Sequence, residues 1–318
     1  MTSNKPYNFA LTGAAGYIAP RHMKAIKETN NVLVAALDKF DSVGIIDSYF
    51  PDASFFTESE RFDRHLDKLR RKGEQKIDFV SICSPNYLHD SHIRLALRND
   101  ANAICEKPIV LNPWNVEALS ELEIETGKNI YTVLQLRHHP SIIALKEKVE
   151  QNKDKIYDID LTYITSRGKW YGISWKGDAT KSGGVATNIG VHFFDMLTWI
   201  FGGVKQSVVH INEPTKTAGF LELENANVRW FLSLDINDIP KEILDKDQRT
   251  YRSIKVGDEE IEFSGGFTDL HTITYQEILK GNGYGLDAAR SSINTVYNIR
   301  NAKAQALVND YHPLLKTI

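Results

Sequence analysis

The chain of 318 residues contains only two cysteines, Cys83 and Cys105, and ten prolines. Both cysteines fall in apolar stretches that we expect to be buried strands. Two such thiols make no disulfide framework and favour a reducing, cytoplasmic location. The sequence has no apolar run long enough to span a bilayer, and the polar residues 1–7 do not resemble a secretion signal. We therefore expect neither a disulfide-stapled secreted protein nor a membrane protein.

An excess of charge of one sign is also missing. The 38 lysines and arginines and the 41 acidic residues leave a net charge of -3, so the sequence shows no basic surface for nucleic acid. The hydrophobic fraction of 42% and the charged fraction of 25% are near the averages of globular proteins. The length suits two domains or one large one, and we find no internal repeat and no low-complexity linker.

The first part of the chain alternates short apolar runs with amphipathic segments. Predicted strands cover residues 8–12, 32–37, 55–56, 79–83, 103–105 and 130–134, and predicted helices cover 19–28, 44–49, 62–72, 92–98 and 113–126. Strands that are separated by helices favour βαβ units and a parallel sheet. Residues 1–132 are therefore predicted to form an α/β domain of the Rossmann type with a doubly wound parallel sheet.

The pattern changes after about residue 135. Predicted strands cover 159–166, 207–211, 218–222, 227–235, 252–256 and 260–263, and predicted helices cover 140–150, 191–201, 268–280 and 286–309. Longer strands in succession favour an open sheet that is antiparallel or mixed, with helices on one face. Residues 133–318 are therefore predicted to form an α+β domain with a large, mostly antiparallel sheet.

A glycine-rich turn follows the first predicted strand. Residues 13–19 read Gly13-Ala14-Ala15-Gly16-Tyr17-Ile18-Ala19, a variant of the dinucleotide-binding fingerprint. Small residues let the backbone approach a pyrophosphate, and the helix that follows offers free N–H groups. Asp38 ends the second strand, where a carboxylate accepts hydrogen bonds from the adenosine ribose. Because its charge would repel a 2′-phosphate, NAD is favoured over NADP.

Two further motifs carry groups suited to acid–base chemistry. Glu106-Lys107-Pro108 ends a later parallel strand, at the sheet edge that faces the ligand crevice. By itself this triplet is typical of a surface turn, but a lysine there can stabilise a developing alkoxide. In the second motif, Asn188, His192 and Asp195 are spaced to share one helical face. His192 titrates near neutrality and suits a base, although a lone histidine in a helix is more often a buried structural residue.

A cationic and aromatic segment precedes the second motif. Four cations lie within fifteen positions among two tryptophans and a tyrosine: Arg167, Lys169, Trp170, Tyr171, Trp175, Lys176 and Lys181. Cations can pair with a pyrophosphate or a carboxylate, and aromatic rings can stack on a base or a sugar. Most charge runs are solvated loops, yet this composition favours contact with an anionic substrate. The other histidines, including His89, His92, His138 and His139, show no metal-ligand spacing, so we expect no catalytic metal.

Together these motifs resemble the Gfo/Idh/MocA oxidoreductases, over nearly the whole chain. The residues that carry the resemblance are the Gly-rich turn, Ser84-Pro85-Asn86 with His89, Glu106-Lys107-Pro108, and the Gly183-Gly184 segment that ends at His192. The family usually carries an aspartate where this chain has Asn188. That departure removes one carboxylate from the expected catalytic set, so Asn188 could only orient the substrate or the lysine.

Within the family, residues 167–192 and the opening residues 13–22 look like the UDP-N-acetylglucosaminuronate 3-dehydrogenases. That resemblance implies NAD-dependent oxidation of the sugar C3 hydroxyl to a ketone, which an aminotransferase would take up on the route to diacetamido-uronic acids of surface polysaccharide (O-antigen). It also implies a homotetramer, and 2-oxoglutarate as the recycling oxidant in some members. Two alternatives stay open: a dehydrogenase of another sugar or polyol in the same family, and a non-catalytic NAD-binding sensor.

The resemblance also assigns residues to roles. Lys107 and His192 would be catalytic, and either could be the proton acceptor. The cofactor would contact Gly13, Ala15, Gly16, Tyr17, Ile18, Asp38, Ser84, Pro85, Asn86, His89, Glu106 and Lys107. The substrate would contact Lys107, Gln135, Arg167, Trp175, Lys181, Ser182, Asn188 and His192.

Overall fold

The chain folds into two compact units. The computed structural model describes residues 5–73, 75–261, 269–307 and 310–316. Unit 1 comprises Met1–Gln135 and Thr268–Ala289, and unit 2 comprises Leu136–Phe267 and Arg290–Ile318. The predicted division after residue 132 placed the segment 268–289 with the second domain, whereas the structure groups it with the first.

Unit 1 is built on a six-stranded parallel sheet of strand order β3-β2-β1-β4-β5-β6. Its strands are β1 (Asn8–Thr12), β2 (Val32–Leu37), β3 (Ser54–Phe56), β4 (Phe79–Ile82), β5 (Asn102–Cys105) and β6 (Ile130–Thr132). The chain leaves β1 toward β2 on one side and returns to β4 on the other. The strand order therefore reverses between β1 and β4, and ligands of such sheets bind at the carboxyl ends of the strands at this point.

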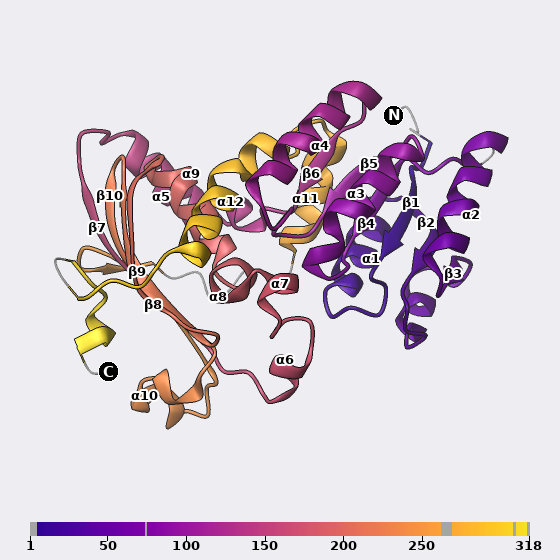
Figure 1. Ribbon diagram of the computed structural model, residues 1–318. Coiled ribbons are helices and arrows are strands. Elements are labelled where there is room, and N and C mark those ends of the chain that lie inside the picture. The colour runs from indigo at the N-terminus through magenta and orange to yellow at the C-terminus, as the bar shows by residue number, and fades with distance from the viewer. Residues whose placement is uncertain (1–4, 74, 262–268, 308–309, 317–318) are drawn as a thin grey trace. The chain divides into compact units, whose positions relative to one another are not determined.

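Two pairs of helices pack against each other in unit 1. The helices of this unit are α1 (Ala19–Glu28), η1 (Gly44–Ser48), α2 (Ser59–Lys72), η2 (Asn86–Leu88), α3 (His89–Arg98), α4 (Pro113–Thr126) and α11 (Leu270–Leu279). Helix α1 lies beside α11, and α3 lies beside α4 (Figure 1). Phe9 of β1, Ile26 of α1 and Tyr275 of α11 share one hydrophobic core. A segment from late in the chain thus completes the Rossmann unit.

Unit 2 contains a six-stranded sheet of order β12-β11-β7-β10-β9-β8. Its strands are β7 (Tyr157–Thr165), β8 (Val204–Asn212), β9 (Lys216–Leu223), β10 (Ala226–Ser233), β11 (Thr250–Val256) and β12 (Glu259–Glu260). Only the β7–β10 pair is parallel among these described strands, and the others are antiparallel. The predicted fold class, a parallel Rossmann sheet followed by a mostly antiparallel sheet, is confirmed.

Successive residues of β10 point to opposite faces of this sheet. Trp230 joins a core with residues of α5 (Pro140–Glu150), α9 (Val191–Phe201) and the end of α12 (Leu286–Asn301). Phe231 joins a smaller core on the other face with Leu315 of η5 (Pro313–Lys316). Successive side chains of a strand point to opposite faces, and β10 therefore has buried apolar side chains on both faces of the sheet. The remaining short elements are η3 (Gln135–His138), α6 (Trp170–Ile173), α7 (Ala179–Ser182), α8 (Gly184–Asn188), η4 (Ile236–Asp238) and α10 (Lys241–Leu244).

The last long helix is shorter than predicted. Helix α12 ends at Asn301 rather than at residue 309, because the Asn212 side-chain amide donates to the carbonyl oxygens of Arg300 and Ala302 at 3.2 and 3.1 Å. The Gln305 N–H then donates to Val209 at 2.8 Å, so the chain leaves the helix to run along β8. Residues 262–263, 268 and 308–309, which the predictions included in strands or helices, lie outside the described residues.

Both cysteines are free and buried, as predicted. Burial raises the pKa of each thiol well above its usual value, so neither is suited to act as a thiolate. No helix in the described part of the chain is long and apolar enough to cross a membrane.

Candidate active site

The turn after β1 brings backbone to the carboxyl edge of the unit 1 sheet. Gly13 has a φ of 82°, and a Cβ at this position would lie 2.5 Å from the backbone nitrogen of Ser84. Its N–H donates to the Leu37 carbonyl oxygen at 2.8 Å. Glycine is required here by the positive φ and by the lack of space for a Cβ. The turn therefore packs closely between the ends of β2 and β4.

Asp38 ties the same turn to the end of β2. Its Oδ2 accepts a hydrogen bond from the Ala15 N–H at 2.9 Å, and its Oδ1 accepts one from the Phe40 N–H at 3.0 Å. Helix α1 begins without a side-chain cap, and the N–H groups of Tyr17 and Ile18 have no partner among the described residues. Exposed N–H groups at a helix start, beside small residues, fit a dinucleotide phosphate. The turn therefore suits the NAD predicted from the sequence.

The two other predicted cofactor motifs are joined by His89. One ring nitrogen of this buried side chain lies 2.7 Å from the Pro108 carbonyl oxygen, and the other lies 2.9 Å from the Ser84 carbonyl oxygen. His92 reaches the Ser84 hydroxyl at 2.8 Å, and burial lowers the pKa of His92 to about 4. The turn after β4, with Pro85 and the buried Asn86, is thereby held beside the turn after β5.

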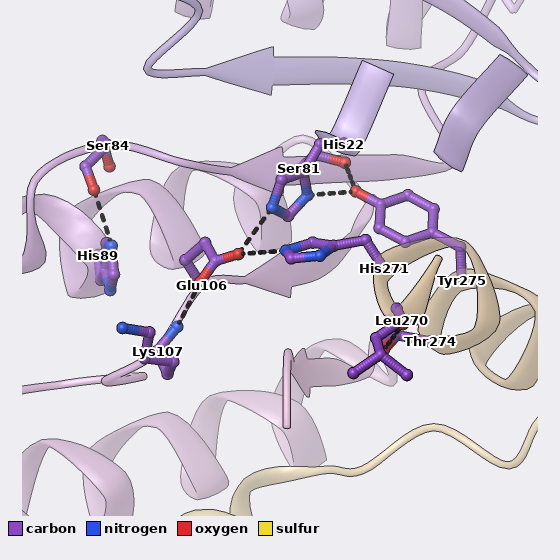
Figure 2. Close-up of polar contacts among 10 residues, drawn as sticks. All are labelled: His22, Ser81, Ser84, His89, Glu106, Lys107, Leu270, His271, Thr274 and Tyr275. Atoms are coloured by element: carbon purple, nitrogen blue, oxygen red, sulfur yellow. Dashed lines mark hydrogen bonds and ion pairs between the residues drawn. The ribbon is translucent and has the colours of Figure 1, made fainter. Parts of the chain in front are cut away.

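Lys107 is half-buried, and its peptide bond to Pro108 is cis. The Glu106 side chain before it is buried and turns into unit 1, where Oε1 lies 2.9 Å from His22 Nε2 and 3.0 Å from His271 Nε2 (Figure 2). Burial alone would raise the pKa of Glu106, but the hydrogen bonds from both histidines hold it well below its usual range. The Glu106 carboxylate is thus occupied by protein donors, and any contact with the dinucleotide would use its backbone.

His22, Glu106 and His271 are also the one described group that could hold a metal ion, since their ligand atoms lie within 4.8 Å of one another. No motif in the sequence points to His22, Glu106 and His271 as a group. His22 and His271 are separated from Glu106 by 84 and 165 positions, and no spacing rule connects them.

In unit 2 the predicted helical face is interrupted. The predicted helix over residues 191–201 is α9, but Asn188 ends the separate helix α8, so the prediction that Asn188, His192 and Asp195 share one helical face is wrong. Gly190 lies at the break, where a Cβ would be 2.5 Å from the Ala186 carbonyl oxygen. Close packing at this glycine thus permits the change of direction between the two helices.

The three polar residues of this motif have different surroundings. Asp195 is buried and forms a two-pronged ion pair with Arg137, at 2.7 and 3.0 Å. Asn188 donates to the Tyr171 phenol oxygen at 2.6 Å. His192 is half-buried at the first turn of α9. Asp195 is therefore structural, whereas Asn188 and His192 remain candidates for substrate contact. Tyr171, which accepts the Asn188 hydrogen bond, is a further candidate.

The cationic and aromatic segment forms a coherent surface of unit 2. Lys176 lies 5.3 and 5.7 Å from the ring centres of Trp170 and Trp175, and its burial lowers the pKa of its ammonium group. Arg167 is exposed and has no carboxylate partner among the described residues, while Lys181 pairs with Asp178 at 3.2 Å. Ser182 is buried and its hydroxyl donates to the Asp178 carbonyl oxygen. The surface around Arg167 and Lys176 thus has positive charge in excess.

Gln135 lies at the end of unit 1, where η3 begins. It is buried, and its side-chain carbonyl oxygen has no hydrogen-bond partner among the described residues. A buried acceptor of this kind usually has a partner in the working protein, which is consistent with its predicted contact with a ligand.

Comparison with known proteins agrees with this layout. Residues 7–134 match a model of an oxidoreductase family with an NAD-binding Rossmann fold, and residues 146–239 match the C-terminal alpha/beta domain of the same family. The WlbA (WbpB) dehydrogenase from Thermus thermophilus, solved with NAD and alpha-ketoglutarate, is 54% identical with a TM-score of 0.94. That match covers 96% of this chain and 99% of the other.

The chain belongs to the Gfo/Idh/MocA oxidoreductase family. The same Thermus enzyme has also been solved with NAD and UDP-GlcNAcA, and there the identity is 53% and the TM-score 0.93, with the same coverage. The family resemblance found in the sequence is therefore confirmed, and unit 1 contains the NAD-binding Rossmann fold of the family.

More distant Gfo/Idh/MocA members match over shorter stretches. Inositol 2-dehydrogenase from Rhizobium meliloti is 27% identical over 203 residues, which are 63% of this chain and 56% of that protein. D-glucoside 3-dehydrogenase from Escherichia coli is 26% identical over 40% of this chain and 36% of its own length. The chain thus spans about half or less of the curated relatives that it matches.

Proposed function

We propose that this protein oxidises the C3 hydroxyl of a UDP-N-acetylglucosaminuronate-type nucleotide sugar to a ketone, with NAD as the cofactor. The end-to-end match to a dehydrogenase solved with NAD and UDP-GlcNAcA carries this proposal. Arg167 and Lys176 support it, because the described residues give neither a carboxylate partner and the substrate carries a pyrophosphate and a carboxylate. The product would be a substrate for an aminotransferase in the synthesis of surface polysaccharide.

Oxidation of a secondary alcohol removes a hydroxyl proton and a hydride from the same carbon centre. Bound NAD would supply the hydride acceptor. We assign the proton to His192, which is half-buried, because imidazole is the side chain best suited to exchange a proton near neutral pH. Lys107 would donate a hydrogen bond to the sugar oxygen and stabilise its developing negative charge. The two roles could be exchanged, and Asn188, which donates to Tyr171, would orient the sugar without taking a proton.

The remaining assignments belong to the same proposal. The T. thermophilus complex contains alpha-ketoglutarate, which is 2-oxoglutarate, and we expect this keto acid to be the oxidant that regenerates NAD here. It would be reduced to 2-hydroxyglutarate, so electrons balance over one cycle. We also propose a homotetramer in the cytoplasm, where NAD, nucleotide sugars and free thiols occur together. The proposed domains are residues 1–132 for the cofactor and 133–318 for substrate and oligomer contacts, except that the segment 268–289, which belongs to unit 1, would go with the cofactor domain.

The test is to incubate the purified protein with NAD and UDP-N-acetylglucosaminuronate, follow NADH absorbance and identify the product by mass spectrometry. We expect turnover with the uronate and none with myo-inositol. Turnover with inositol alone would support a polyol dehydrogenase, and NAD binding without any turnover would support a sensor. Lys107→Ala and His192→Ala should each lower kcat by roughly 10² to 10⁴-fold while NAD affinity stays nearly unchanged. Near-normal turnover in either variant would remove that residue from the mechanism.

A further inference from the structure

A chain of buried hydrogen bonds leads from β4 and α11 to the residue before Lys107. The Ser81 hydroxyl lies 2.6 Å from the Tyr275 phenol, which lies 2.7 Å from His22 Nδ1, and His22 Nε2 reaches Glu106 (Figure 2). All of these side chains are nearly or fully excluded from solvent. They lie within unit 1, on β4, α1 and α11 and at the end of β5.

The carboxylate sets the direction of this chain. A carboxylate only accepts, so His22 must present its Nε2–H to Glu106, which leaves Nδ1 to accept the Tyr275 proton. Burial lowers the pKa of His22, and this agrees with a neutral ring that carries one proton. His271 donates its Nε2–H to the same Glu106 oxygen at 3.0 Å. Two imidazole N–H donors therefore keep one buried carboxylate charged.

The second Glu106 oxygen acts on the neighbouring backbone. Oε2 accepts a hydrogen bond from the Lys107 N–H at 3.2 Å, so the carboxylate joins helices α1 and α11 to the turn that carries the lysine. The other side of this turn is braced by His89, which lies 2.7 Å from the Pro108 carbonyl oxygen. The backbone on both sides of Lys107 is thus fixed, by the Glu106 carboxylate before it and by the contact of His89 with the Pro108 carbonyl oxygen after it.

The arrangement is costly for stability. Taking a carboxylate out of water is costly, and the remaining His271 nitrogen, Nδ1, is buried without a partner among the described residues. An unsatisfied buried polar group lowers the free energy of unfolding, and apolar side chains would fill the same space without that cost. An arrangement kept at a cost beside a proposed catalytic group indicates a functional role.

We propose that His22, His271 and Tyr275 are positioning residues, which act through the Glu106 carboxylate to hold the Lys107 turn in its working conformation. The inference rests on the catalytic role proposed for Lys107. A metal centre made of His22, Glu106 and His271 is disfavoured. A closed zinc site takes four protein ligands and an open one needs access to solvent, whereas the described group offers three nearly inaccessible ones.

The first experiment does not depend on turnover. Hydrogen exchange followed by mass spectrometry reports the Lys107 amide in a peptide spanning residues 104–110. Glu106→Gln and His271→Leu should speed exchange of this amide at least about tenfold, because its acceptor is lost or released. His312→Gln is the matched control, since His312 is a buried histidine of unit 2 bonded to Thr162 at 2.9 Å. Unchanged exchange in Glu106→Gln overturns the proposal, whether or not the protein is active.

The second experiment separates positioning from folding. In Glu106→Gln and His271→Leu, kcat should fall on the order of 10²-fold, because Lys107 is misplaced. The KM for NAD should stay within about twofold, because the Gly-rich turn of residues 13–19 is intact. His271→Gln, which keeps an N–H donor, should recover part of that loss, and His312→Gln should keep normal kcat. Equal kcat in His271→Gln and His271→Leu would contradict the role of the donated hydrogen bond.

Two controls distinguish this inference from other failures. If the wild type does not oxidise the nucleotide sugar but the exchange of Lys107 still depends on Glu106, the proposed function fails and the positioning network stands. Metal analysis of the purified wild type should find no stoichiometric transition ion. A bound ion that is lost in His22→Gln would overturn the hydrogen-bond network in favour of a metal centre.

Discussion

At the scale of single residues, Asp38 is attached to the Gly-rich turn through both carboxylate oxygens. We predict that Asp38→Ala weakens NAD binding by about 1.5–3 kcal/mol, because it removes charged acceptors from the turn and from the ribose, and that it narrows the preference for NAD over NADP. Fluorescence titration of both cofactors measures this, with the exposed Asp41→Ala as control. Equal affinity of the wild type for NAD and NADP would contradict the role of Asp38.

Single residues also show where sequence reasoning succeeds. Gly13, Asp38 and Lys107 stand at fixed offsets from predicted strands, and the parallel sheet brings them to one edge. Glu106 shows the opposite case, because its partners come from distant parts of the chain and are set by packing. The sequence showed that Glu106 ends a strand, but it did not show which way the side chain turns.

At the scale of elements, the predicted limits of α1, α5 and α9 agree with the structure, since proline at the start or a clear apolar period defines each one. The separate short helix α8 before α9 was not predicted, because the spacing of Asn188, His192 and Asp195 alone indicated one helical face. The close packing of Gly190 between the two helices includes a contact with Leu232, which is distant in the sequence. The end of α12 was missed for the same reason, since Asn212 comes from another strand.

The break leads to a prediction about Gly190. A Cβ there would lie 2.5 Å from the Ala186 carbonyl oxygen, 2.6 Å from Leu232 and 2.9 Å from Phe194, so the neighbouring elements must move. Gly190→Ala should lower the free energy of unfolding by about 1–3 kcal/mol and reduce turnover, since Asn188 and His192 flank the break. Gly44→Ala, where a Cβ meets nothing within 4 Å, is the control. Equal melting temperatures for the two variants would contradict this account.

At the scale of the whole molecule, buried histidines should make stability depend on pH. Burial lowers the pKa of His312 to about 4, from an unfolded value of about 6.5. As pH falls from about 6.5 to about 4, the unfolded chain binds a proton that the folded chain does not. The free energy of unfolding therefore falls through this window, by up to about 3 kcal/mol for His312, and is unaffected above it. His22 and His92, whose pKa values are also lowered, act in the same direction.

His312→Gln tests the pH prediction. The variant should melt near the wild-type temperature at neutral pH, and its melting temperature should fall less steeply between about pH 6.5 and about pH 4. Thermal denaturation followed by circular dichroism across this range measures the slope. Parallel curves for the two proteins would show that His312 titrates normally in the folded state.

The molecule as a whole carries a net charge of -3, yet its proposed substrate is an anion. Long-range attraction therefore cannot supply the affinity, and local cations without carboxylate partners must do so. Arg167 is exposed, lies in the surface that contains Lys176, and has no such partner among the described residues. Arg167→Ala should raise the KM for the uronate by roughly 10 to 100-fold, because one charge-assisted hydrogen bond contributes about 1.5–3 kcal/mol, with little change in kcat.

The same variant should lose discrimination between sugars. Wild-type protein should prefer the uronate to UDP-N-acetylglucosamine, which lacks the carboxylate, and Arg167→Ala should narrow that preference by raising only the uronate KM. Steady-state kinetics with both substrates measures this, and Lys303→Ala, an exposed cation of unit 2, should match the wild type. If the wild type uses both sugars equally well, Arg167 does not recognise the carboxylate. If Arg167→Ala raises both KM values alike, the arginine contacts the pyrophosphate that the two sugars share.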